Sequence, residues 1–185
     1  EQAKEIEKYY EQCAEEGSTE EQIEESKRAM SKMNAILGHP DRIKKLAVDI
    51  VGHYESLCAE KPEIVQKAMI VCADRKIAFH VLKAIESLRP DWAVKRKAEN
   101  EDELTQEQLD KLEALPKINL VATQGQNDDK ELYDLCGTKE HRKMLDKQFK
   151  NTDSNFKIAI VVDMWITGFD VPSLAVMYID KPLQK

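Results

Sequence analysis

Four short apolar runs constrain the fold of this chain more than any other feature of its sequence. They lie at residues 68–72, 118–123, 157–162 and 175–179. A run with little polar alternation is typical of a strand that is covered on both faces. Helical patterns separate the first three runs, and this alternation predicts a parallel sheet with helices on both faces. We therefore predict an α/β fold with four buried strands.

Residues 1–62 contain no such run and show helical signals instead. Three predicted helices follow one another, and Ser18 with Glu21 fits a capping box at the start of the second. The third has the clearest 3.6-residue period, which predicts one buried face. Its apolar positions are Ile43, Leu46, Ala47, Ile50, Val51, Tyr54, Leu57 and Cys58. We predict a helical segment over residues 1–62 that leads into an α/β domain over residues 63–185.

Helices and one insertion are predicted between the strands. Asp74 is placed to cap a helix that reaches about Leu88. A second helical stretch precedes the third apolar run and is broken near Gly137, since glycine commonly ends a helix. Residues 95–116 are polar and highly charged. We expect them to form an insertion with one exposed helix on the rim of the sheet.

The charge distribution argues against an extensive basic surface. The net charge is −7, and residues 1–30 carry ten acids and four bases. Residues 61–185 are nearly neutral, with 21 acids and 20 bases. A protein that binds nucleic acid by itself usually has a basic face, and none is obvious here. If the chain contacts DNA, we expect it to do so through a few placed groups.

Composition also bears on where the protein is found and on whether it binds a metal. No run of about 18 apolar residues is present, so we expect no contact with a membrane. The four cysteines and four histidines show none of the spacings of metal sites. We therefore predict a cytoplasmic protein with reduced thiols and no metal site.

The carboxyl ends of the predicted strands are where a ligand would bind, because ligands of open parallel sheets bind at that edge. Three loops follow these ends, at residues 72–75, 123–126 and 163–170. In the third, Gly168 permits close approach of the backbone, while Thr167 and Asp170 offer a hydroxyl and a carboxylate. These groups suit contacts to phosphate or ribose. An ordinary strand-to-turn connection with a capping aspartate remains the alternative from spacing alone.

Several catalytic motifs are missing. The sequence has no glycine-rich phosphate loop ending in Gly-Lys-Ser/Thr. It has no acidic pair after an apolar strand of the kind that holds Mg²⁺, and no nucleophile elbow. The sequence ends directly after the fourth run, with no helix to cover it, so we expect a fragment of a larger protein.

The third loop carries a specific resemblance. The stretch KIAIVVDMWITGFDVPSLAVMYIDKP resembles the region around helicase motif V in the motor (R) subunit of type I restriction enzymes. Upstream, KAMIVCADRKIAFHV resembles the motif IV strand and helix, and NLVATQGQ with HRKMLDKQFK fits the segment between them. Residues 63–185 therefore resemble most of a second RecA-like lobe of a superfamily-two translocase, incomplete at its carboxyl end.

The resemblance implies a role for the parent protein. Such a subunit hydrolyses ATP to pull double-stranded DNA past a complex with specificity and methyltransferase subunits, and cuts it with a separate nuclease domain. The parent would be a type I site-specific deoxyribonuclease. Its cofactors would be ATP and Mg²⁺, ligated mainly by a first lobe that this chain lacks.

The resemblance also implies roles for single residues. Gly168 and Asp170 would lie near the ribose and phosphates of ATP. The residues implied to contact or reach the DNA backbone are Arg75, Thr123, Gly125, Asp163 and Thr167. Hydroxyls and backbone N–H groups can hold DNA without reading its sequence.

Departures from the family pattern limit what this chain does alone. The next motif, a Q-x-x-x-R run, would follow Lys185, and neither the first lobe nor the nuclease domain is present. Phosphoryl transfer needs the charges that those parts supply. We expect the chain alone to hydrolyse no ATP, to hold no cofactor, and to bind ATP and DNA poorly.

Structural interpretations of the same residues stay open. Arg75 could be an exposed first-turn residue, Asp163 a strand-end cap, and Trp165 a packing anchor. For the whole chain, the alternative to a motor lobe is a non-catalytic scaffold whose helical segment docks other subunits.

Overall fold

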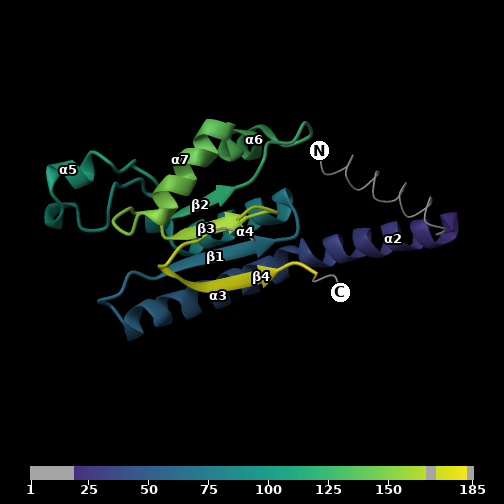
Figure 1. Ribbon diagram of the computed structural model, residues 1–185. Helices are drawn as coiled ribbons and strands as arrows, with labels where there is room; N and C mark the ends of the chain where they lie inside the picture. The colour runs from purple at the N-terminus through teal and green to yellow at the C-terminus, as the bar shows by residue number, and fades with distance from the viewer. Residues whose placement is uncertain (1–18, 166–169, 183–185) are drawn as a thin grey trace.

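The computed structural model describes residues 19–165 and 170–182, so the first predicted helix lies outside the described residues. The centre of the fold is a four-stranded parallel sheet in the order β2-β3-β1-β4. The sheet confirms the predicted α/β architecture (Figure 1). Its strands are β1 (Lys67–Cys72), β2 (Ile118–Val121), β3 (Ile158–Val161) and β4 (Leu174–Asp180).

The strand register brings all four carboxyl ends to one edge of the sheet. Val161 of β3 pairs with Val71 of β1 and with Val121 of β2. Cys72 pairs with Asp180 of β4. The loops that follow the strands therefore open on the same edge, as the parallel arrangement predicted.

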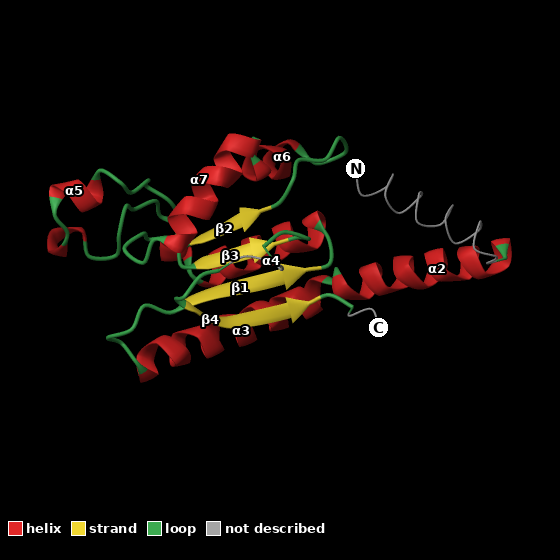
Figure 2. Cartoon of the chain, in the orientation of Figure 1, coloured by secondary structure: helices red, strands yellow, loops and turns green. Residues whose placement is uncertain are grey.

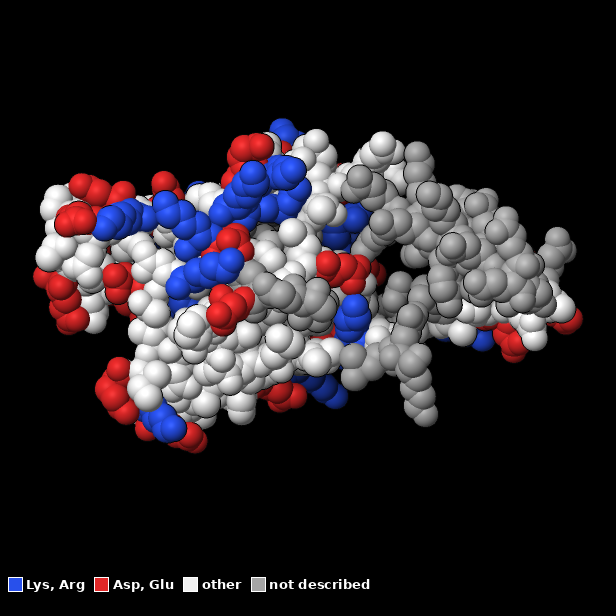
Figure 3. All heavy atoms as spheres, viewed as in Figure 1, with Lys and Arg blue, Asp and Glu red and all other residues white. Residues whose placement is uncertain are grey.

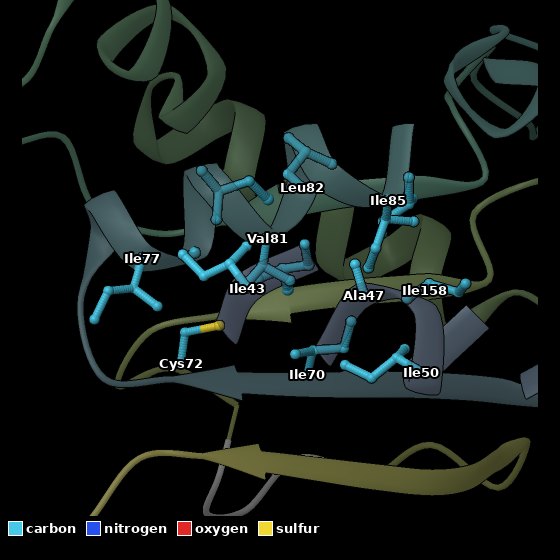
Figure 4. Packing of buried hydrophobic residues seen from close by; sticks show 14 of the residues in the cluster. Ile43, Ala47, Ile50, Ile70, Cys72, Ile77, Val81, Leu82, Ile85 and Ile158 are labelled. Atoms are coloured by element: carbon cyan, nitrogen blue, oxygen red, sulfur yellow. The ribbon is translucent and has the colours of Figure 1, made fainter. Parts of the chain in front are cut away.

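Two helices, α3 (Pro40–Glu60) and α4 (Arg75–Leu88), cover one face of the sheet. The stripe of α3 is buried against β1 and α4, and Figure 4 shows Ile43, Ala47 and Ile50 pointing at this core. Asp74 caps α4 as predicted, since its carboxylate accepts a hydrogen bond from Ile77 N at 2.8 Å. The third predicted helix is thus part of the α/β core.

The second face is covered by α7 (Lys139–Lys150), which follows the short helix α6 (Lys130–Cys136). Its buried residues Leu145 and Phe149 meet the other side of β1 and β3. Thr138 caps α7 by accepting a hydrogen bond from His141 N. Gly137, with φ of 59°, separates the two helices, so the predicted break lies where glycine is favoured. Helices on both faces are confirmed.

The fourth strand differs from the prediction of full burial. Along β4, Val176 and Tyr178 pack against the first core, but the alternate residues are exposed, with Met177 at 40% and Ile179 at 53%. The prediction was wrong here because β4 is an edge strand, and no described element covers its second face. The apolar run itself gave no sign of this difference.

The second helix, α2 (Glu20–Leu37), projects from the carboxyl edge of the sheet (Figure 1). Its cap is Thr19 with Gln22 in a reciprocal capping box. The prediction of Ser18 with Glu21 was therefore wrong by one residue. Such boxes share the same spacing, so sequence alone could not choose between two adjacent hydroxyl residues.

The charged insertion lies at the amino edge of the sheet, opposite the candidate site (Figure 2). It contains the short helices η2 (Glu101–Glu103) and α5 (Gln106–Leu109), after η1 (Pro90–Ala93). Thr105 and Gln108 form a capping box at the start of α5, although this helix has only four residues. None of the helices over residues 19–165 and 170–182 has the length and apolar character needed to cross a membrane.

Two buried lysines at the amino edge of the sheet donate hydrogen bonds to backbone carbonyl groups. Lys67 Nζ donates to the carbonyl oxygens of Phe149 at 2.5 Å and Asn151 at 2.7 Å. Lys157 Nζ donates to Thr152 O at 2.7 Å. Burial lowers the pKa of both amines, that of Lys67 to about 7. These donors satisfy carbonyl groups at the end of α7, which no helix can satisfy internally.

Candidate functional site

The candidate site is the carboxyl edge of the sheet, where loops after β1, β2 and β3 open together (Figure 2). The structure brings Arg75 and Gly125 into contact there. Asp163 follows β3 on the same edge, and Thr123 and Asp170 are exposed. The predicted residues Thr167 and Gly168 lie outside the described residues.

Arg75 is held by a carboxylate that sequence reasoning missed. Its Nε donates to Asp128 at 3.2 Å, and the second oxygen of Asp128 accepts from Gly125 N at 2.6 Å. The side chain of Asp128 is 3% exposed, while that of Arg75 is 20% exposed. Arg75 is therefore no freely exposed first-turn residue: its guanidinium is partly buried and fixed at the rim. The available signal was an acidic residue in the loop that follows β2.

Gly125 makes room for this arginine. A Cβ atom at that position would lie 2.0 Å from Arg75 Nη2 and 2.7 Å from its Cζ. No pair of heavy atoms tolerates such a separation without movement. The absence of a side chain at Gly125 thus sets where the guanidinium lies.

Replacing Gly125 by alanine should displace Arg75 from Asp128. Because the loss of a charge-assisted hydrogen bond costs about 1.5–3 kcal/mol, we expect the free energy of unfolding to fall by up to that amount. Chemical denaturation measures the loss, and the Arg75 Nε–H resonance reports the contact. Gly52→Ala is the control, since nothing lies within 4 Å of a Cβ there. A Gly125→Ala protein with an unchanged Arg75 resonance would contradict the steric argument.

The loop after β3 starts in an unusual conformation. Asp163 has φ of 51° and Trp165 has φ of 61°, and positive φ is uncommon for residues other than glycine. Backbone of this kind concentrates at functional sites. The Asp163 carboxylate pairs with Lys181 Nζ at 3.1 Å, which joins the loops that follow β3 and β4. Lys181 was also missed, although its place directly after the fourth strand was visible.

Trp165 anchors this loop to the second core. Its ring stacks on Phe149 of α7 with 5.5 Å between centroids and 26° between planes. Downstream, Val171 is buried in the same cluster and begins a turn into β4. Asp170 is exposed immediately before this buried residue, so its backbone is tied to the core on one side.

A further ion pair holds the edge to α3. Asp180, at the end of β4, is buried and accepts two hydrogen bonds from the Arg42 guanidinium. The hydrogen bond to Asp180 raises the pKa of Arg42. Arg42 also donates to Leu37 O at 3.2 Å, beside the break between α2 and α3. The contact therefore fixes the start of α3 against the edge that carries the candidate site.

The edge offers hydrogen-bonding groups and charge. Within residues 19–165 and 170–182, no group of three or more His, Cys, Asp or Glu could hold a metal ion. The described groups are one guanidinium paired with a carboxylate, two exposed carboxylates and a threonine hydroxyl. Such groups can position a phosphate or ribose.

The family model and the similar proteins all point to one group of enzymes. A family model described as type I restriction enzyme subunit R domain 3 matches residues 32–185. A type I restriction enzyme HindI endonuclease subunit from Haemophilus influenzae is 30% identical over 162 residues, which is 87% of this chain. A putative MjaIXP endonuclease subunit from Methanocaldococcus jannaschii is 30% identical over 97% of the chain. This chain covers 14% of the length of each of these relatives.

Proposed function

Because the chain belongs to the type I restriction enzyme subunit R family, over the region described as domain 3, we propose that it forms part of a DNA-translocating motor. The parent would be a site-specific deoxyribonuclease that hydrolyses ATP to move duplex DNA. This chain would supply one lobe, and the relatives' names, which give them as endonuclease subunits, support a restriction enzyme as the parent.

The observation that carries the proposal is the gathering of three loops at one sheet edge. Arg75, Gly125 and Asp163 follow three different strands at this edge, where Arg75 and Gly125 are in contact. Ligands of open parallel sheets bind at this edge. A second lobe docked against it would enclose a nucleotide between the two, and closure of lobes is a common way to assemble a catalytic site.

In this proposal Asp170 and Gly168 form one side of an ATP site. Asp170 is exposed and could accept hydrogen bonds from ribose hydroxyls, with Gly168 nearby in the chain. Arg75 could contact a phosphate of the DNA backbone, although Asp128 already offsets part of its charge. Thr123, Gly125, Asp163 and Thr167 would lie toward the DNA backbone. When bound, ATP and Mg²⁺ would supply the reacting phosphoryl group and its charge neutralisation, with Mg²⁺ held mainly by another lobe.

The parent's partners would be duplex DNA and the specificity and methyltransferase subunits of a restriction complex in the cytoplasm. Sequence reading would belong to those subunits, because the groups on this edge suit backbone contacts. By itself the chain should not turn over ATP, since phosphoryl transfer needs charges from both lobes.

Asp170→Ala in the intact subunit tests the proposal. Turnover of ATP and translocation of DNA should fall by about a hundredfold, because Asp170 would hold the ribose and a misplaced nucleotide can cost about that much in rate. Assembly with the other subunits should survive, since Asp170 is exposed. The measurements are phosphate release, a triplex-displacement assay for translocation, and gel filtration for assembly.

Asp49→Ala is the matched control, because Asp49 is an exposed aspartate on α3 away from the sheet edge. It should leave ATP turnover unchanged.

The alternative function is a docking scaffold, and the exposed Met33 and Ile36 of α2 favour a contact with another subunit. Turnover that persists in Asp170→Ala would favour the scaffold over the motor.

A further inference from the structure

The exposed side of α7 carries a row of lysines that the candidate site does not use. They are Lys139, Lys143, Lys147 and Lys150, all exposed. Their spacing of four, four and three residues places them on one face of the helix. The opposite face is buried through Leu145 and Phe149. Figure 3 shows Lys and Arg side chains gathered over α7, and we call these four residues the lysine row.

Helix stability explains only half of the lysine row. Lys147 and Lys150 lie in the last turn, where positive charge interacts favourably with the helix dipole. Lys139 and Lys143 lie toward the other end, where the same interaction is unfavourable. Asp146 pairs with Lys150 at 3.0 Å. Among the described residues, no ion pair is formed by Lys139, Lys143 or Lys147, although Glu140 offsets part of the charge, since hydrogen bonds lower its pKa and Lys143 and Lys139 help to lower it further. Because the four lysines outnumber Glu140 and Asp146 on this side of α7, the outer face keeps a net positive charge.

We infer that the lysine row binds the phosphate backbone of duplex DNA. Over eleven residues α7 advances about 16 Å, which matches about five base pairs of duplex at 3.4 Å each. Lysine suits this partner because it presents a mobile point charge, and such contacts position a duplex without reading it. The choice of DNA over another polyanion rests on the proposed function.

The surroundings limit the extent of this surface. The insertion lies beside the C-terminal end of α7, since Gln148 Nε2 donates to Lys111 O at 3.0 Å. Acidic residues of η2 and α5 there would repel a polyanion. At its other end the row begins after α6, which is joined to the candidate edge by Gln124 Nε2 donating to Tyr133 O at 3.0 Å. A duplex would therefore extend from the candidate edge along α7.

The test is the salt dependence of DNA binding by the intact subunit, measured by fluorescence anisotropy with a short duplex and no ATP. The variant replaces Lys139, Lys143 and Lys147 by glutamine together. Since each phosphate contact contributes about 0.9 to the slope of log affinity against log salt, the slope should become shallower by about 2.7. Affinity at low salt should fall by roughly tenfold or more. All three side chains are exposed, so the unfolding midpoint should not change.

The matched control replaces Lys32, Lys44 and Lys45, which are exposed on α2 and α3, by glutamine. It should keep the wild-type slope. An unchanged slope in the α7 variant, or an equal loss in the control, would overturn the inference. A slope change seen only with duplex RNA would overturn the assignment to DNA. The proposed function fails separately, through undiminished ATP turnover in Asp170→Ala, and DNA binding absent from the wild-type protein would overturn both.

Discussion

Replacing Phe149 by alanine should lower the free energy of unfolding by about 3–5 kcal/mol, the usual cost of removing a fully buried phenylalanine. The ring is completely buried and lies 4.9 Å from the ring of Phe156 and 5.5 Å from that of Trp165. Its removal leaves a cavity between α7 and the sheet. It also removes the stack that holds Trp165, so the loop before Asp170 should lose its anchor. Urea denaturation measures the stability, and tryptophan emission reports the environment of Trp165.

Phe149→Leu and Phe156→Leu separate these two effects. Both keep an apolar side chain and leave a smaller cavity than alanine does, so each should cost less stability than Phe149→Ala. Phe156 is equally buried. Only the change at Phe149 removes the stacked partner of Trp165, so only Phe149→Leu should shift the tryptophan emission to longer wavelength. Equal emission spectra for the two variants would show that the stack does not fix the loop.

Stability should rise with pH between about 7 and 9 because of Lys67. Burial lowers the pKa of this amine to about 7 in the folded chain, and neighbouring Lys157 lowers it further while Asp153 opposes the shift. An unfolded chain keeps the proton up to about 10.4. In this window the unfolded state binds more protons, so the free energy of unfolding increases with pH. The contribution of Lys67 alone from pH 7 to 9 is roughly 2 kcal/mol, by the same linkage.

Urea denaturation at several pH values from 7 to 9 measures the gain. Above about pH 8 the thiols oppose part of it, because an unfolded thiol ionises near pH 8.5, whereas burial raises the pKa of Cys72 and raises that of Cys136 to about 11. Lys67→Met should remove most of the pH dependence, although the loss of its hydrogen bonds to Phe149 and Asn151 also lowers stability. Lys44→Met, at an exposed position, should keep the wild-type profile. A Lys67→Met protein that also keeps it would show that Lys67 is not the titrating group.

The lysine row on α7 shows that the net charge of a segment does not predict how charge is distributed on the protein surface. Residues 61–185 have nearly equal numbers of acids and bases, and no basic face was predicted from them. Seven of the 21 acids lie in the insertion, while Lys139, Lys143 and Lys147 share the outer side of one helix. The helical spacing was visible in the sequence. Which side of the helix faces solvent depended on Phe149 packing against the sheet.

The amino-acid sequence alone determined the parallel sheet, the helix cap at Asp74 and the edge of the candidate site, because helical connections between successive strands make them run parallel and a helix cap depends on residues close in the chain. Only the tertiary structure decided that β4 is an open edge, that Asp128 holds Arg75, and that Lys181 reaches Asp163. The physical reason is that these features depend on which strands become neighbours. Arg75 and Asp128 are 53 residues apart, and no local pattern records a contact across that separation.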